Sequence, residues 1–252
     1  MARTREIEGI ILSAKRSGES NKLICCLAAD EMFHAQVYGA YKGKSRNGAN
    51  CEMFSTVRLY TYLNPVKNQT SVKDSVLLKT CAGIRGSLGK IFTASLMCEL
   101  IEKSYAGGGE YSSMLDLLAE SLDLLDGYEK SEAGQASADY LLIQFMLRFL
   151  EFSGSGFYAG LCQNCGKLTE GTVYYSFHSS EIVCADCTSG DAAALSNGIV
   201  NYISFTLGKG LAPAAAVRLA DADRVLLKGV LIQHIQAVGN ITLKSLAAGE
   251  MR

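Results

Sequence analysis

The chain has 252 residues, of which 48% are hydrophobic and 19% charged, a composition that indicates a folded globular protein and excludes a disordered one. It has no run of the roughly 18 or more apolar residues that a membrane-spanning helix needs, and no apolar leader with a cleavage site follows its N-terminus. The formal net charge of -1 excludes a strongly basic or acidic protein. We therefore expect a cytoplasmic protein.

The charge is unevenly distributed along the chain. Residues 1–80 contain 12 Lys+Arg and 7 Asp+Glu, a balance of +5, whereas residues 81–252 contain 12 Lys+Arg and 18 Asp+Glu, a balance of -6. Such asymmetry indicates separate partners for the two regions. It slightly favours attraction of nucleic acid to the first region, although an offset of this size also arises by chance.

Five short segments within the first 80 residues have the pattern of β-strands. Apolar runs and period-2 alternation, punctuated by Gly, Asn and Pro, predict strands over residues 6–14, 22–28, 33–38, 56–62 and 70–78. Five short strands fit a small barrel such as the OB-fold. We predict a five-stranded OB-fold barrel over residues 1–80.

The rest of the chain has helical periodicity. Apolar residues recur at three- and four-residue steps from Ile84 to Leu100, which predicts a helix that ends at Ala106–Gly109. Ser113 and Asp116 fit a capping box for a helix over residues 114–125, with Gly127 as its C-terminal cap.

A polar stretch over residues 128–137 is predicted to be a loop. The following segment, residues 139–152, is apolar almost all round, which is typical of the central helix of a bundle. Two more helices are predicted over residues 192–207 and 221–238. The chain is therefore expected to be an α+β multidomain protein, with a helical domain over residues 81–252.

Four cysteines form a pattern within the helical part. Cys162 and Cys165 are separated by two residues, and 18 residues later Cys184 and Cys187 repeat this spacing. Two such pairs with a spacer of this length are a specific zinc signal, because each tight turn directs two thiolates at one point. The alternating spacer segment 172–177 is expected to form a hairpin, within an insertion over about residues 158–190.

Four thiolates fill the coordination sphere of one Zn²⁺ ion, which favours a structural site over a catalytic one. His178 lies between the two pairs, and we interpret it as a surface or packing residue. A thioredoxin-like redox role and a nucleobase deaminase lack their sequence signatures. The other five cysteines have no ligand spacing and are interpreted as core residues: Cys25, Cys26, Cys51, Cys81 and Cys98.

The most suggestive surface segment is 38–48, which combines three cations with two tyrosines and several glycines. Cations that follow phosphates and aromatic rings on which bases stack are what a single-strand-binding groove requires. A solvated loop with tyrosines that cap the barrel fits the same residues equally well. The candidate DNA contacts are Lys15, Arg16, Lys22, Tyr41, Lys42, Lys44, Arg46, Arg58 and Tyr60.

Taken in order, these features resemble the RecO recombination and repair proteins of bacteria. The resemblance rests on the segments of residues 8–12, 18–22 and 39–46, on the pattern Phe145-x-Leu147-x-x-Leu150-x-x-x-Gly154, and on the two cysteine pairs. It implies an N-terminal OB-fold, a C-terminal helical domain and an inserted zinc motif. It also implies Lys42, Lys44 and Arg46 as DNA contacts.

The resemblance further implies a DNA repair mediator that is not an enzyme. Such a protein binds single- and double-stranded DNA, anneals complementary strands and joins RecR. Together they help to load RecA onto strands coated by single-strand-binding protein, whose acidic C-terminal tail is a further expected partner. A cytoplasmic, nucleoid-associated location follows from this role.

Two other functions fit the sequence. The chain could be a zinc adaptor that binds only proteins, with DNA contacted by a partner. A zinc hydrolase is the third hypothesis, which a metal ion held by four sulfur ligands without an open position would exclude.

Overall fold

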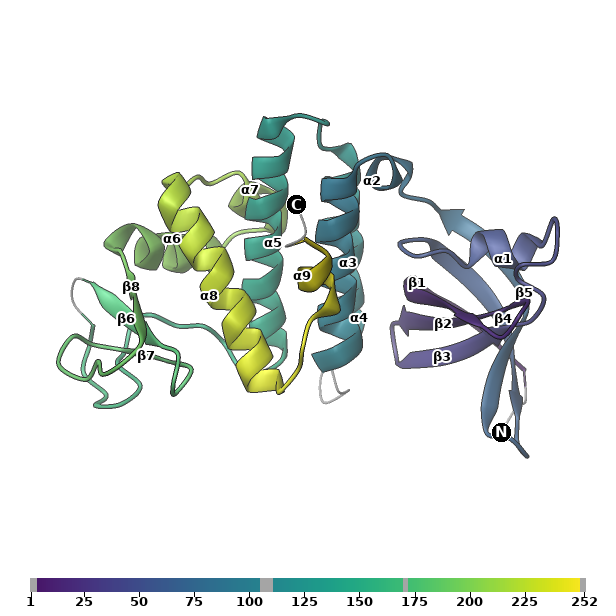
Figure 1. Cartoon of the computed structure of the whole chain (residues 1–252), viewed down its shortest axis with the longest axis horizontal. Coiled ribbons are helices and arrows are strands. Elements are labelled where there is room, and N and C mark those ends of the chain that lie inside the picture. Colours follow the sequence, from purple (N-terminus) through teal and green to yellow (C-terminus); the bar gives the residue numbers. More distant parts are fainter. Residues whose placement is uncertain (1–3, 105–110, 170–171, 250–252) are drawn as a thin grey trace. The chain divides into compact units, whose positions relative to one another are not determined.

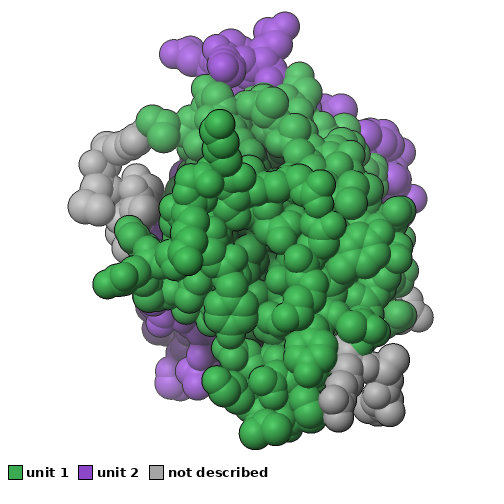
Figure 2. All heavy atoms as spheres, turned by 90° about the vertical axis from the view of Figure 1, so that its right-hand side faces the viewer, with its two compact units in different colours: residues 1–127, 248–252 green, residues 128–247 purple. Residues whose placement is uncertain are grey.

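The computed structural model describes residues 4–104, 111–169 and 172–249. The chain forms two compact units, which we call unit 1 (residues 1–127 with 248–252) and unit 2 (residues 128–247) (Figures 1 and 2). Unit 1 thus contains the barrel together with the helices that follow it. The division into domains at residue 80 stays a prediction. Within the described residues, no helix combines the length and apolar character of a membrane span.

The barrel of unit 1 has five strands in the closed order β1-β2-β3-β5-β4 (Figure 1). This arrangement confirms the predicted OB-like barrel, and each strand lies within three residues of its predicted bounds. The strands are β1 (Thr4–Ser17), β2 (Asn21–Ala28), β3 (Met32–Val37), β4 (Thr56–Asn64) and β5 (Gln69–Lys79).

Strand β1 closes the barrel because it pairs with two partners. Its first half pairs with β4 and its second half with β2, and the register shifts between Ile11 and Ser13. Such a bulge bends a strand and increases its twist. Gly9 lies where β1 passes both neighbours, and an added Cβ there would lie 2.4 Å from the carbonyl oxygen of Leu27. Only glycine permits this close approach.

Both faces of β2 are buried. Ile24 and Cys26 belong to the barrel core, whereas Cys25 and Leu27 alternate with them and are also fully buried. The helices α3 (Leu88–Ser104) and α4 (Tyr111–Gly127) pack on β1 and β2 respectively, and they cover this outer face. An apolar run without polar alternation is the sequence signature of such a strand.

Two details of the predicted helices in unit 1 are wrong. The helical face expected from Ile84 is interrupted, because α2 (Ala82–Arg85) ends before α3 begins. Ser113 lies inside α4 and is not its N-cap, so the Ser-x-x-Asp pattern is not a capping box here. The predicted stop at Ala106–Gly109 lies outside the described residues.

Unit 2 is built around α5 (Glu132–Phe152). Every residue from Ala138 to Leu150 is buried, which confirms the predicted central helix. Its neighbours are α6 (Asn197–Leu207), α7 (Leu211–Ala215) and α8 (Asp221–Gly239), and α9 (Lys244–Gly249) follows. The predicted loop over residues 128–137 is too long, because Ser131 caps α5 by accepting a hydrogen bond from the Gly134 amide at 3.2 Å.

Two of the buried polar side chains of α5, Gln144 and Arg148, form hydrogen bonds with each other and with α6 and the segment that follows it. Gln144 donates to the Tyr202 hydroxyl at 2.8 Å and to Thr206 Oγ1 at 3.0 Å. Arg148 donates to Gln144 Oε1 at 2.5 Å and to the carbonyl oxygen of Lys209 at 2.7 Å. A buried polar group with satisfied hydrogen bonds avoids most of its desolvation penalty.

A small antiparallel sheet lies between α5 and α6 in the chain. Its strands are β6 (Val173–Ser176), β7 (Glu181–Val183) and β8 (Ala192–Leu195), in the order β7-β6-β8. The pair β6–β7 confirms the predicted hairpin. The helix predicted over residues 192–207 begins only at Asn197, because residues 192–195 pair with β6 instead. Tertiary pairing here outweighs the helix propensity of three consecutive alanines.

Candidate metal centre and nucleic-acid interface

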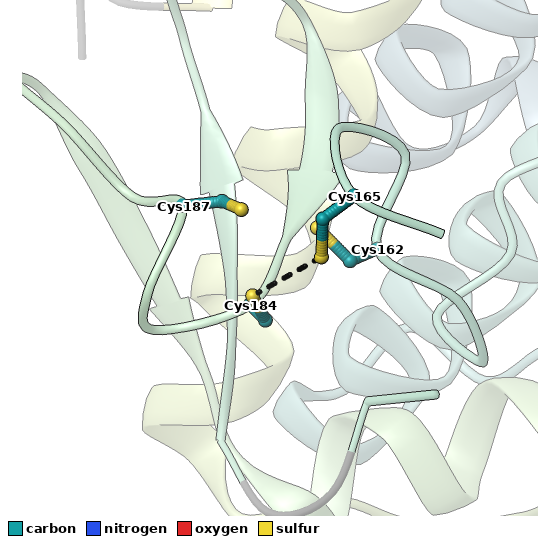
Figure 3. A group of neighbouring side chains, drawn as sticks. All are labelled: Cys162, Cys165, Cys184 and Cys187. Atoms are coloured by element: carbon teal, nitrogen blue, oxygen red, sulfur yellow. Dashed lines mark hydrogen bonds between the residues drawn. The ribbon is translucent and has the colours of Figure 1, made fainter. Parts of the chain in front are cut away.

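The four patterned cysteines meet at one point in unit 2. Their Sγ atoms all lie within 4.8 Å of one another, and those of Cys165 and Cys184 are 3.9 Å apart (Figure 3). Cys162 and Cys165 come from the loop before β6, whereas Cys184 and Cys187 follow β7. The cluster can hold a metal ion, and among the described residues His178 does not belong to it.

Backbone hydrogen bonds shape both cysteine turns. The Gly166 amide donates to the carbonyl oxygen of Cys162 at 2.8 Å, and the amides of Cys187 and Thr188 donate to that of Cys184 at 3.1 and 3.0 Å. Gly166 has a φ of 70°, a left-handed conformation that glycine adopts without strain. The first turn is tied to β7 through the amide of Gln163, which donates to the carbonyl oxygen of Ile182 at 3.0 Å.

The thiols of the cluster differ in acidity. Backbone N–H groups, that of Cys184 first and that of Cys165 next, lower the pKa of Cys162 to about 6. In contrast, hydrogen bonds with the thiols of Cys165 and then Cys184 raise the pKa of Cys187 to about 12. Four thiolates at such short separations repel one another unless a cation neutralises them. The geometry and donor set fit a thiophilic metal ion in a closed site.

One predicted DNA contact is not on the surface. Lys22 is only 1% exposed. Its ammonium donates to the carbonyl oxygens of Gly48 and Cys51 at 2.8 and 3.2 Å and to Glu52 Oε1 at 2.5 Å. Lys22 is therefore corrected from a phosphate contact to a buried residue that supports the segment 48–52.

Three more of the predicted cations form ion pairs. Arg46 contacts Asp74 at 2.5 Å and holds the pKa of that carboxyl group below its ordinary value. Arg58 contacts Glu8 at 2.6 Å and Glu6 at 3.3 Å. Lys15 contacts Glu102 at 3.1 Å.

Each of these pairs reduces the positive potential that a phosphate would meet. Arg46, which the resemblance groups with Lys42 and Lys44, is thus partly neutralised by its carboxylate. Tyr60 lies opposite Glu6 on β1 and Asp74 on β5 in the strand register, beside the same acidic side chains.

The remaining candidates gather around one loop of the barrel. We call Arg16, Tyr41, Lys42 and Lys44 the loop patch. All four are exposed, and among the described residues none of its three cations forms an ion pair with a carboxylate. The Arg16 guanidinium lies 5.3 Å from the centre of the Tyr41 ring, within the range of a cation–π contact.

The loop that carries the patch is held at both ends. The Tyr41 amide donates to the carbonyl oxygen of Ser20 at 3.0 Å. After the loop, Ser45 caps the short helix α1 (Arg46–Asn50) by accepting from the Gly48 amide at 3.1 Å. A Cβ on Gly48 would lie 2.0 Å from the carbonyl oxygen of Ala40. The glycine is therefore required for the loop to fold back on itself.

Lys73 and Tyr62 were not among the predicted residues. The Lys73 ammonium lies 5.0 Å from the centre of the Tyr62 ring, and Lys73 is exposed. This combination of a cation and an aromatic ring repeats that of Arg16 and Tyr41. Simple alternation gives Lys73 the parity of the buried Ser71 and Ser75. Lys73 is exposed because it lies unpaired at a register shift of β5, where Tyr60 pairs with Asp74 and Thr61 with Val72, so the sequence pattern gave no signal for it.

Comparisons with known proteins agree with these features. Residues 85–247, more than half of the chain, match the family described as "Recombination protein O C terminal". The chain is 30% identical over 194 residues to the "DNA repair protein RecO" of Leptospira biflexa, covering 74% of this chain and 73% of that protein.

Two further relatives extend over the barrel. The "DNA repair protein RecO" of Oceanobacillus iheyensis is 22% identical over 243 residues, covering 95% of this chain and 90% of that protein. The protein of the same description from Pelotomaculum thermopropionicum is 24% identical over 236 residues, covering 91% of this chain and 88% of its own length.

Proposed function

This chain belongs to the RecO family of DNA repair proteins, and on that premise we propose that it is a non-enzymatic mediator that binds single- and double-stranded DNA through the loop patch and anneals complementary strands. The observation that carries the proposal is the presence of three exposed cations beside an exposed tyrosine, none of them paired with a carboxylate in the part of the chain that the structure describes. Cations of this kind neutralise phosphates and release counterions.

Annealing follows from the same charges. Two strands approach one another against the repulsion of their phosphates, and a cationic surface that binds both strands lowers that repulsion. Tyr41 offers a ring for base stacking, which contributes about 1–3 kcal/mol per base and tolerates any sequence. These interactions require no bond-making residue.

The proposal includes the partners that the family resemblance implies. We propose that the chain joins RecR, and that the two help to load RecA onto DNA coated by single-strand-binding protein. The acidic C-terminal tail of that protein is the proposed contact for the helices of unit 2.

We further propose that the four-cysteine cluster holds one structural Zn²⁺ ion. Four thiolates complete a tetrahedral sphere and leave no position for water or substrate. Cys162, Cys165, Cys184 and Cys187 would each supply one thiolate, and when bound the ion would neutralise their charges and join the loop before β6 to the loop after β7. In this role the metal stabilises unit 2 and takes no part in a reaction.

The DNA proposal is tested by salt titration of single-strand DNA binding. In the double variant Lys42→Gln, Lys44→Gln, we expect weaker binding at low salt. We also expect the slope of log affinity against log salt to become shallower by about 1.4, because each phosphate contact on a single strand contributes about 0.7. The matched control is Lys130→Gln, Lys167→Gln, which removes two exposed lysines of unit 2.

A protein-binding adaptor without its own DNA contact is the second candidate function. It predicts the same DNA affinity and salt slope for the wild type, the loop-patch variant and the control. That result would refute the proposed DNA contact. If the loop-patch variant still binds RecR but binds DNA more weakly than the wild type, the proposed DNA contact is supported.

A further inference from the structure

A second cluster of metal-ligating side chains lies in unit 1, far along the sequence from the patterned cysteines. Cys25 lies on β2, His34 on β3 and Glu102 on α3, and their ligand atoms all lie within 4.8 Å of one another. Cys25 and His34 are directly opposite in the antiparallel register of β2 and β3. The helix α3 packs on the barrel and brings the carboxylate to this pair.

We propose that Cys25, His34 and Glu102 form a second metal site, which binds Zn²⁺ through one sulfur, one nitrogen and one oxygen ligand. Zn²⁺ accepts all three donor types, and three protein ligands with a water molecule are a common set for it. In a tetrahedral site, neighbouring nitrogen and oxygen ligands lie about 3.4 Å apart. His34 Nε2 and Glu102 Oε1 are 3.9 Å apart, so only a small movement is needed.

The surroundings of the cluster support ion binding. Ser13 Oγ donates to Glu102 Oε1 at 3.0 Å and so orients the carboxylate, as the outer hydrogen bonds of metal sites generally do. Cys25 is fully buried, whereas the side chain of His34 is 57% exposed. The site is therefore closed on the sulfur side and open to solvent on the imidazole side, where an ion can enter.

Lys15 distinguishes this site from the four-cysteine cluster. Its ammonium lies 3.1 Å from Glu102 Oε1, on the same oxygen that faces His34. A divalent ion must displace this ammonium, whose side chain is 67% exposed and can move into solvent. The second site is therefore the weaker one, and removal of Lys15 strengthens it.

The test is a Co²⁺ titration of the full chain after one equivalent of Zn²⁺ has been added, which occupies the four-cysteine cluster because that site is the tighter of the two. Zinc binds a given site more tightly than Co²⁺, so the added Co²⁺ reports on the second site. We expect one further ion, with the absorption of a Co²⁺–thiolate bond.

Four variants make the assignment specific. Cys25→Ser should abolish the thiolate band, and His34→Gln should lower the affinity at least tenfold. Lys15→Met should raise the affinity several-fold, a gain that misfolding does not produce. The control His178→Gln removes an exposed histidine outside the cluster and should change nothing. Absence of a second ion in the wild type, or an unchanged spectrum in Cys25→Ser, would overturn the proposal.

Discussion

The four-cysteine cluster of unit 2 and the cationic surface of unit 1 are assembled in different ways. Each cysteine turn is closed by hydrogen bonds within a few consecutive residues, such as that of the Gly166 amide with Cys162. Whether a cation of the barrel is available to bind phosphate depends instead on carboxylates that are distant in the sequence. Asp74 on β5 pairs with Arg46, and Glu8 on β1 pairs with Arg58. The geometry of the cluster is local, whereas the availability of a surface charge depends on the whole fold.

The four lysines that were predicted to contact DNA also differ in whether other parts of the fold bind their ammonium groups. Lys42 and Lys44 lie in an exposed loop, and neither forms an ion pair with a carboxylate of the described residues. The buried Lys22 ammonium forms hydrogen bonds with the segment 48–52, and Lys15 forms an ion pair with Glu102. Changes at the cysteine cluster and at the buried Lys22 should therefore affect stability, whereas changes at the loop patch should affect DNA binding.

The largest expected effect is the loss of a metal ligand in unit 2. Cys184→Ser should reduce bound metal at the cluster and lower the stability of unit 2 by about 3 kcal/mol or more, because the binding energy of a structural metal is folding energy. DNA affinity should change less than twofold, since the loop patch belongs to unit 1. Metal analysis, thermal unfolding and a DNA titration measure these three quantities.

The control for this variant is Asp186→Ser, which changes an exposed residue between Cys184 and Cys187. It should keep the metal and the melting temperature of the wild type. A large loss of DNA affinity in Cys184→Ser alone would contradict the separation of the two roles, because the cluster would then support the DNA-binding surface as well.

The contrast also explains how far the sequence predicts the molecule. The strands were predictable because alternation depends only on which face is buried, and the cysteine cluster because its spacing is local. The burial of Lys22 was within reach as well, since it shares the parity of Ile24 and Cys26 inside the barrel. The pairing of Arg58 with Glu8 was not, because it requires the register of β1 against β4.

The errors in the helical part have a similar cause. Ser131 followed by Glu132 is a capping signal that was available for the start of α5. In contrast, nothing local marks residues 192–195 as a strand, because their partner β6 lies sixteen or more residues earlier in the chain. The cluster Cys25, His34 and Glu102 was also not predictable from the sequence, because its members come from three different elements and Glu102 lies on a helix after the barrel.

The second effect in size is expected at Lys22. Lys22→Met should destabilise unit 1 by about 2 kcal/mol, because it leaves the buried carbonyl oxygens of Gly48 and Cys51 without their donor. Lys42→Met should leave the stability unchanged and weaken DNA binding instead. Chemical denaturation and DNA titration of both variants test this separation. Equal stability of Lys22→Met and wild type would show that the ammonium is not held as described.

The smallest effect concerns acid and involves the support of the small sheet. His234 on α8 contacts the Tyr175 hydroxyl of β6 at 3.3 Å, and its ring lies edge-on to Phe157. Burial lowers the pKa of His234 below its ordinary value of 6.5, against the opposing effect of hydrogen bonds with the backbone of Ser155 and Ser180. His234 is therefore protonated less readily in the folded protein than in the unfolded chain.

The sign of the pH dependence follows from this difference. The contribution of neutral His234 is fully present above about pH 6.5 and is lost as the pH falls through that value toward the folded pKa. We expect the free energy of unfolding of unit 2 to decrease between pH 7 and pH 5, and this decrease to be shallower in His234→Gln. The exposed His178→Gln serves as the control. Denaturation of metal-loaded protein at each pH measures the difference, and parallel curves for His234→Gln and wild type would contradict it.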